Sequence, residues 1–137
     1  MQILFFAKLY LLTIPVFFVV DLLWLGVVAK HFYRDHLAHL LSPDVNWTAA
    51  VSFYLIYIAG ILYFAVAPAL ARESLGLALL NGALFGFFTY ITYELTNMAT
   101  LPKWPLKVVL VDTLWGVVLC ASVAAGSYLL GRWLLGA

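Results

Sequence analysis

Residues 90–116 read YITYELTNMATLPKWPLKVVLVDTLWG, and this stretch decides the fold. An apolar helical pattern ends before its two prolines, Pro102 and Pro105, and a second one begins directly after them. Acids, amides, hydroxyls and aromatic rings gather in the same stretch, whereas the rest of the chain is mostly hydrocarbon. The stretch therefore predicts two apolar helices joined by a short loop, with a polar site nearby.

The composition of the whole chain is that of a membrane protein. Of the 137 residues, 66% are hydrophobic and 9% are charged, and the mean hydropathy is +1.08. Soluble domains are about 45–50% apolar and about 25% charged, so a water-soluble protein is excluded. A spanning helix needs about 20 apolar residues, so four spans nearly fill the chain.

Four apolar runs predict an all-α integral membrane four-helix bundle, in which residues 1–137 form one transmembrane domain. The predicted spans are residues 3–29, 47–67, 75–97 and 106–135. The first run is too long for the apolar region of a signal peptide, so we expect it to be retained. Pro15 removes a backbone hydrogen bond from that run and predicts a bend.

Residues 30–41 differ in kind from the four apolar runs. Tyr33 and Leu37 recur at helical spacing, whereas His31, Asp35 and His39 occupy the opposite arc. This pattern predicts a short amphipathic helix that lies in the membrane interface between the first two spans.

Small residues recur in the third span, where Ala78, Gly82 and Gly86 fall at every fourth position. Such a seam lets another helix approach closely. The net charge of +1 gives no basis for nucleic-acid binding, so membrane lipid is the expected partner. Basic residues are divided almost evenly between the two sides, which leaves an antiparallel homodimer open.

Three acids lie inside the predicted spans, at a similar depth from one membrane boundary. Asp21 precedes the end of the first span, Glu94 precedes the end of the third, and Asp112 follows the start of the fourth. At 1.5 Å per residue, all three are expected within roughly 5–12 Å of the same boundary. An acid in a spanning helix costs about 2.5–3.5 kcal/mol, so three at one level indicate a function.

Helical spacing adds four more residues to the acids. Tyr90 and Asn97 share a face with Glu94, Trp24 shares one with Asp21, and Trp115 shares one with Asp112. We therefore expect one polar pocket that binds a proton, a divalent cation or a polar substrate group. Crowded carboxylates repel one another, so at least one should hold a proton unless a cation is present. The alternative is that the acids only hold the helices together.

A short internal similarity accompanies these acids. Residues 20–28 read VDLLWLGVV and residues 111–118 read VDTLWGVV. In antiparallel helices the two segments would lie about a local two-fold axis, as in transporters built from inverted repeats. The alternative is chance similarity in a chain rich in Leu, Val and Trp.

A second candidate site lies between the first two spans. His31, Asp35 and His39 recur at every fourth position, so one helix face could present all three to a metal ion. The alternative is that they are solvated residues on the polar face of an interfacial helix.

The run LTNMATL at residues 95–101, followed by Trp104, Pro105 and DTLWG at residues 112–116, is a specific signature. Together with residues 21–26, it resembles a family of small four-helix bacterial inner-membrane proteins of unknown function. Glu94 stands where the family pattern has aspartate. The resemblance implies a multi-pass protein of the bacterial inner membrane, and it implies no activity.

Three functions remain open from the sequence. The first is proton- or cation-coupled transport of a small solute, with Asp21, Glu94 and Asp112 as the coupling site. The second is a membrane enzyme or accessory protein that acts on lipid or isoprenoid groups, with the carboxylates as general acid and base. The third is an assembly subunit that meets a partner through the seam at Gly82 and Gly86. A transporter needs access from both faces, whereas an enzyme needs one lateral or interfacial opening.

Overall fold

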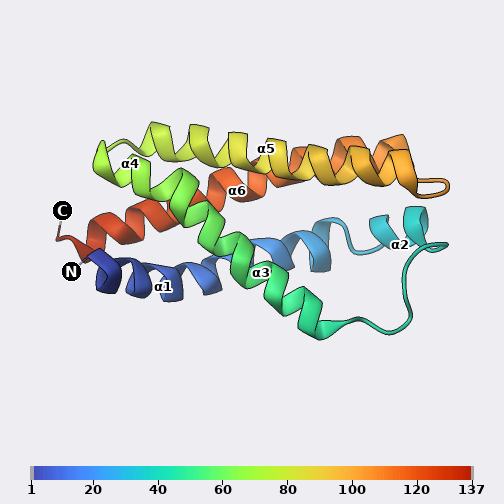
Figure 1. Ribbon diagram of the computed structural model, residues 1–137, viewed down its shortest axis with the longest axis horizontal. Helices are drawn as coiled ribbons and strands as arrows, with labels where there is room; N and C mark the ends of the chain where they lie inside the picture. The colour runs from blue at the N-terminus through green and yellow to red at the C-terminus, as the bar shows by residue number, and fades with distance from the viewer. Residues whose placement is uncertain (1, 137) are drawn as a thin grey trace.

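The computed structural model describes residues 2–136, which form helices and no strand. Four helical segments are long and apolar enough to cross a membrane: Gln2–Val28, Trp47–Ala71, Leu75–Thr100 and Leu106–Leu134. They run along one long axis, and both chain ends lie at the same end of the bundle (Figure 1). The predicted all-α four-span bundle is confirmed.

The first span changes its winding near its end. Helix α1 (Gln2–Leu23) continues through Pro15, and the five-residue π-helical segment η1 (Trp24–Val28) follows it. The N–H of Ala29 donates to the carbonyl of Trp24, five residues back, at 2.7 Å. Short π-helical turns occur frequently at functional sites, and this one begins three residues after Asp21.

The second span is longer than predicted. It consists of α3 (Trp47–Ile61), the π-helical segment η2 (Leu62–Val66) and α4 (Ala67–Ala71). Asn46 caps its start, because its side chain accepts the N–H of Ala49 at 3.1 Å. Pro68 does not end the span, because it lies in the first turn of α4, where its missing N–H is tolerated.

Helices α5 (Leu75–Thr100) and α6 (Leu106–Leu134) form a closely packed hairpin. A Cβ atom added to Gly82 would lie 2.5 Å from the carbonyl oxygen of Cys120, and one added to Gly86 would overlap the carbonyl of Gly116. Ala78 continues this row and packs in a cluster with Tyr128 of α6. The small residues of the predicted seam therefore lie against the neighbouring helices.

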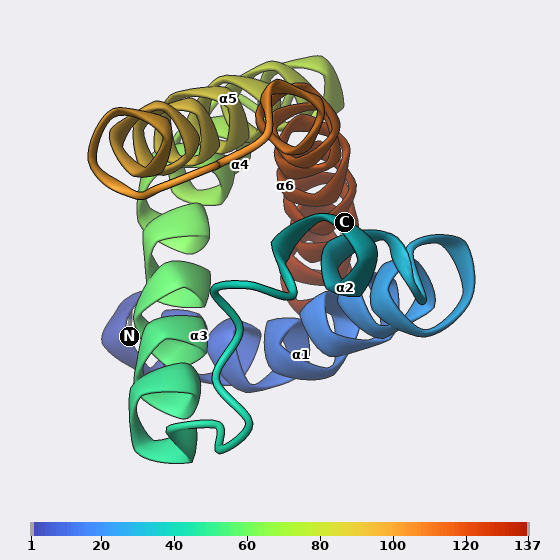
Figure 2. The same ribbon diagram turned by 90° about the vertical axis from the view of Figure 1, so that its right-hand side faces the viewer.

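Helix α2 corrects the predicted interfacial helix of residues 30–41. It covers only Phe32–Leu37, so His31 precedes it and His39 follows it. The N–H groups of Leu40 and Leu41 both donate to the carbonyl of Leu37, which closes the helix. The chain then leaves helical geometry and crosses the end of the bundle to reach α3 (Figure 2).

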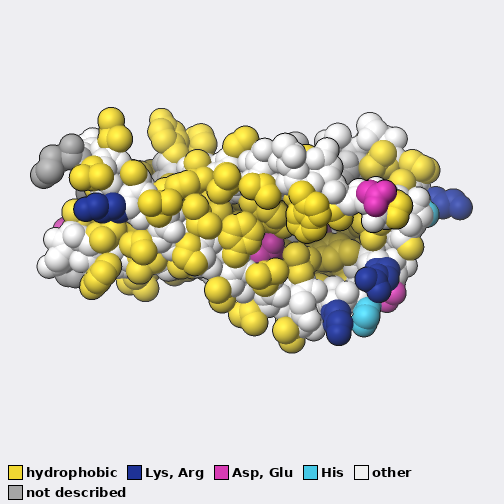
Figure 3. Space-filling view, turned by 90° about the horizontal axis from the view of Figure 1, so that it is seen from below, with side chains coloured by type: hydrophobic (Ala, Val, Ile, Leu, Met, Phe, Trp, Pro, Cys, Tyr) yellow, Lys and Arg dark blue, Asp and Glu magenta, His cyan; other side chains and the backbone are white. Residues whose placement is uncertain are grey.

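The half of the bundle that contains both chain ends is closely packed. Its core includes Leu9 and Phe17 of α1, Ile58 of α3, and Leu119 and Val123 of α6, all essentially inaccessible. The face of the bundle shown in Figure 3 is hydrophobic along most of its length, and its Lys and Arg side chains lie toward the two ends. This distribution is that of a protein surrounded by lipid.

One buried polar pair lies within the packed half. Thr13 of α1 donates to the carbonyl of Leu9 at 2.7 Å, so Ser127 of α6 must donate to the Thr13 hydroxyl, also at 2.7 Å. Both side chains are fully buried. The pair links the first span to the last.

We expect Thr13→Val and Ser127→Ala each to lower the free energy of unfolding, because each removes one partner of this pair. The double variant should cost less than the sum, with a coupling of about 0.6–1.7 kcal/mol, as for other hydrogen bonds between membrane helices. SDS titration of all four proteins measures the coupling. Additive losses would mean that the two hydroxyls do not interact.

Candidate functional site

A cavity of about 880 Å³ occupies the other half of the bundle. All four spans contribute to its walls, and so do α2 and the segment that follows it. The lining residues are Asp21, Trp24, Leu25, Tyr33, Leu41, Val45, Phe53, Tyr54, Tyr57, Thr89, Tyr90, Tyr93, Asp112 and Trp115. The walls are thus mainly aromatic, with two carboxylates among them.

The cavity opens on the side of the bundle. Leu25 of η1, Phe53 of α3 and Tyr93 of α5 line the cavity and are also exposed on the surface, so they form the lateral part of its rim. Leu41 and Val45, which follow α2, are also exposed and complete the rim toward the end of the bundle. The first turns of α3 stand away from the other spans (Figure 2). Figure 3 shows the surface hollowed beside acidic side-chain atoms (magenta). The mouth therefore lies on the lateral surface of the bundle and extends toward the segment after α2.

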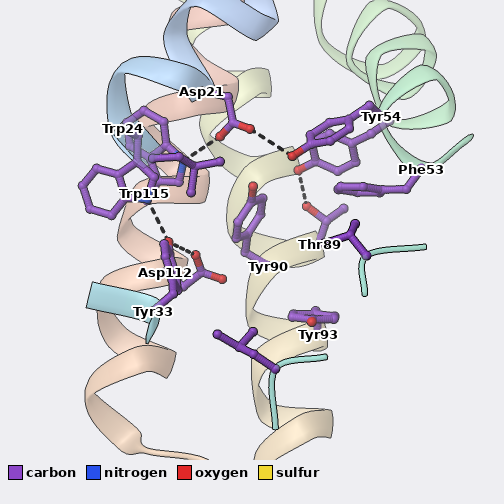
Figure 4. A pocket seen from close by; sticks show the side chains of 14 residues that line it. Asp21, Trp24, Tyr33, Phe53, Tyr54, Thr89, Tyr90, Tyr93, Asp112 and Trp115 are labelled. Atoms are coloured by element: carbon purple, nitrogen blue, oxygen red, sulfur yellow. Dashed lines mark hydrogen bonds between the residues drawn. The ribbon is translucent and has the colours of Figure 1, made fainter. Parts of the chain in front are cut away.

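Asp21 lies on the inner wall of the cavity. It continues the buried row of α1 formed by Leu9, Thr13 and Phe17 at every fourth position, and it is 7% exposed. Its carboxylate accepts hydrogen bonds from Trp115 Nε1 at 3.4 Å and from the Tyr54 hydroxyl at 3.3 Å (Figure 4). Both bonds are longer than the usual 2.7–3.2 Å, so the carboxylate keeps capacity for another donor.

Asp112 of α6 is 9% exposed and holds helix α2 against the bundle. The Tyr33 hydroxyl donates to Asp112 Oδ1 at 2.6 Å and accepts from Trp24 Nε1 at 2.8 Å. Burial and the neighbouring Asp112 carboxylate raise the pKa of Tyr33 above its ordinary value. Tyr33 therefore remains a hydrogen-bond donor to Asp112.

Glu94 lies beside Asp112 but outside the cavity. It is 1% exposed, its carboxyl group is within hydrogen-bonding reach of the Asp112 carboxyl group, and Trp104 Nε1 donates to it at 3.0 Å. Asp112 and Glu94 thus form a carboxyl pair, whereas Asp21 occupies another wall. The three acids lie at the same end of the bundle and are divided between two places.

The two similar segments found in the sequence are in direct contact in the wall of the cavity. The indole rings of Trp24 and Trp115 stack with centroids 4.6 Å apart and planes 7° from parallel. Trp115 donates to Asp21, the acid of the other segment, and Trp24 reaches Asp112 through Tyr33. Trp115 therefore contacts the acid of the other segment directly, whereas Trp24 contacts it only through Tyr33, so the two halves are not equivalent.

No basic side chain of residues 2–136 lines the cavity. The one ion pair among residues 2–136 joins Arg132 to Glu73 at 2.8 Å, at the opposite end of the bundle. The carboxylates therefore give the cavity an acidic character that no neighbouring Lys, Arg or His offsets.

The described residues contain no group of three His, Cys, Asp or Glu side chains that is placed to hold a metal ion. The predicted set of His31, Asp35 and His39 is not assembled on one helix face, because α2 begins after His31 and ends before His39. His39 Nε2 instead lies 3.2 Å from the carbonyl oxygen of Pro102. Asp21, Glu94 and Asp112 likewise do not form a three-carboxylate site for a divalent cation among the described residues.

Four residues proposed from the sequence line the cavity together with Asp21: Trp24, Tyr90, Asp112 and Trp115. Asn97 does not line the cavity, and neither does Glu94, which lies one turn before it on α5. Sequence reasoning missed the roles of Tyr33, Tyr54 and Trp104, which donate hydrogen bonds to Asp112, Asp21 and Glu94. The spacing of Tyr54 and Tyr57 is the signal that could have identified one wall.

A second polar contact lies deeper in the cavity wall. The Tyr57 hydroxyl lies 2.7 Å from Thr89 Oγ1 and 3.1 Å from Cys120 Sγ. Thr89 donates its own proton to the carbonyl of Phe85 at 2.7 Å, so Tyr57 is the donor to Thr89 or Cys120. This hydroxyl is therefore already used within the protein.

Comparison with known proteins gives one match. Neither the curated proteins nor the solved structures contain a match to this chain. A family described as "Predicted membrane protein (DUF2177)" matches residues 6–129, which include the two middle spans, most of the first and last spans, and every residue that lines the cavity. The chain therefore belongs to the DUF2177 family of predicted membrane proteins.

Proposed function

We propose that this chain is a multi-pass protein of the bacterial inner membrane that binds a lipid-like molecule through its lateral opening and acts on the polar end of that molecule. The observation that carries the proposal is the aromatic cavity, which is open at the side of the bundle and acidic at its inner wall. Ligand sites are typically apolar cavities of about 300–1,000 Å³ with a few converging polar groups. Asp21 and Asp112 supply such groups.

The acids suit general acid–base chemistry on the bound molecule. Asp21 faces the cavity directly and can accept a proton from the polar end of a ligand. Glu94 adjoins Asp112, and Asp112 lines the cavity, so a proton shared by these two carboxyl groups lies at the cavity wall. Tyr33 links Asp112 to Trp24 through two hydrogen bonds. An enzyme and an accessory protein that presents the molecule to another enzyme would both use this arrangement.

Coupled transport is the second candidate, and the paired carboxyl groups inside the membrane favour it. A transported solute must also leave on the other side. The packed half of the bundle, with Phe17, Ile58 and Leu119 fully buried at its centre, leaves no route for it in this conformation. A laterally loaded site is therefore the better-supported function.

Photo-crosslinking tests whether the cavity holds a selected molecule. Phe53 lines the cavity and is 49% exposed, whereas Phe87 of α5 is 42% exposed and lines no cavity described here. We expect p-benzoylphenylalanine at position 53, irradiated in native membranes, to give one dominant adduct by intact-protein mass spectrometry. The same group at position 87 should give the mixture of bulk phospholipids. The same mixture at both positions would contradict the proposal.

A further inference from the structure

The hydrogen bonds of the cavity indicate the chemistry of the polar end of the ligand. Trp115 and Tyr54 donate to Asp21, Trp24 donates to Tyr33, and Tyr33 donates to Asp112. The hydrogen-bond donors of these four side chains are therefore already paired with acceptors within the protein. A carboxylate has about four acceptor positions, and the two contacts to Asp21 are long. The inner wall thus offers more acceptors than donors.

The charges of the lining residues also favour a ligand that donates hydrogen bonds. Asp21 and Asp112 line the cavity, and no Lys, Arg or His side chain lines it with them. A phosphate, a diphosphate or a fatty-acid carboxylate at this wall would face two negative groups without a cation to balance them. An organic cation would instead balance the charge of Asp21 and donate to its free acceptor positions.

The surroundings of Asp21 fit such a cation. Figure 4 shows the Asp21 carboxylate between Trp115 and Tyr54, with the Tyr90 hydroxyl pointing toward the same space. Among residues 2–136, the Tyr90 hydroxyl makes no hydrogen bond, so its oxygen can accept from a ligand and its own proton is free to bond Asp21. Aromatic ring faces also attract organic cations directly.

We infer that the cavity takes a long-chain amine, with its ammonium group bound between Asp21 and Tyr90 and its apolar chain leaving past Phe53. This inference rests on the proposed function and names the ligand class for the same site. The ammonium group supplies the protons that the inner wall lacks. The aromatic wall of α3 accommodates the chain, which reaches the membrane through the mouth.

An internal competition tests the inference. Protein that carries p-benzoylphenylalanine in place of Phe53 is placed in phosphatidylcholine nanodiscs with equal mole fractions of dodecylamine, dodecanol and dodecanoate. Position 87 reports the composition of the bulk lipid. A hydrogen bond to a charged group contributes about 1.5–3 kcal/mol, so the amine should exceed the other two adducts at position 53 about tenfold or more. Asp21→Asn should abolish that preference, because the amide has the same shape without the charge.

The possible outcomes separate the two proposals. Equal yields of all three adducts at position 53, above those at position 87, would overturn the amine and leave the binding cavity standing. A preference for dodecanol would also overturn the amine, because it would mean that Asp21 is protonated in the bound state. Yields at position 53 that only match position 87 would contradict both proposals. Glu73→Gln is the control, because Glu73 pairs with Arg132 at the opposite end of the bundle, and it should keep the preference for the amine.

Discussion

Substitution of Gly86 by alanine is expected to cost about 3 kcal/mol or more in the free energy of unfolding. The added Cβ atom would overlap the backbone carbonyl of Gly116 and touch Cys120 Cβ at 3.0 Å. Overpacking typically costs about 1–3 kcal/mol, and the upper end applies here because backbone atoms cannot turn away as a side chain can. SDS titration monitored by tryptophan fluorescence measures the loss.

Gly76→Ala is the matched control for this prediction. Gly76 lies in the same helix, and the nearest atom to its added Cβ is Ser74 Oγ at 3.8 Å, an ordinary contact distance. Both substitutions gain the same intrinsic helix propensity, so their difference reports the packing of α5 on α6 alone. Equal stability of the two variants would show that α5 and α6 do not approach closely at Gly86.

The four spans are predictable from sequence because hydropathy alone distinguishes them. Their ends are harder to predict, as the second span shows. Pro68 suggests an end near residue 67, but the helix continues to Ala71 because the proline occupies the first turn after a π-helical segment. A change in winding that lets a proline be tolerated depends on local backbone geometry, which hydropathy does not encode.

The end of the bundle at which the acids lie is predictable from sequence, but the direction in which each acidic side chain points is not. Ala78, Gly82, Gly86, Tyr90 and Glu94 follow one another at every fourth position of α5. The small residues of this row pack on α6, so the same row turns Glu94 toward Asp112 and out of the cavity. Spacing places Tyr90 and Glu94 on one face correctly. The rotation of that face relative to α1 depends on the packing of all four spans.

The outer wall of the cavity could not be predicted, because distant segments form it. Tyr33 reaches Asp112 across 79 positions of sequence, and Leu41 and Val45 close the cavity from a segment without regular structure. An aromatic residue at an interface reads in sequence as a membrane anchor. Only the path of the chain over the end of the bundle identifies it as part of a site.

Removal of the Tyr33 hydroxyl is expected to release the segment of residues 32–46, the lid of the cavity. Tyr33→Phe deletes the donor to Asp112 and the acceptor for Trp24 Nε1 together. A hydrogen bond to a charged group contributes about 1.5–3 kcal/mol, so the open population of the lid should rise about tenfold or more. Hydrogen–deuterium exchange in nanodiscs measures this at the amides of Asp35, Leu40 and Leu41, which are bonded only within the lid and the residue before it.

The control for the lid is Tyr63→Phe, because Tyr63 is exposed on the second span and makes no hydrogen bond within residues 2–136. It should leave exchange in the lid unchanged. Asp112→Asn should give an intermediate rate, since the amide oxygen still accepts the Tyr33 proton without a full charge. If exchange in Tyr33→Phe equals that of the unaltered protein, buried Leu37 and the contact of His39 with Pro102 hold the lid instead. Faster exchange of the lid amides, with unchanged exchange in α1 and α6, would show that the Tyr33 hydroxyl holds the lid over the acidic wall of the cavity.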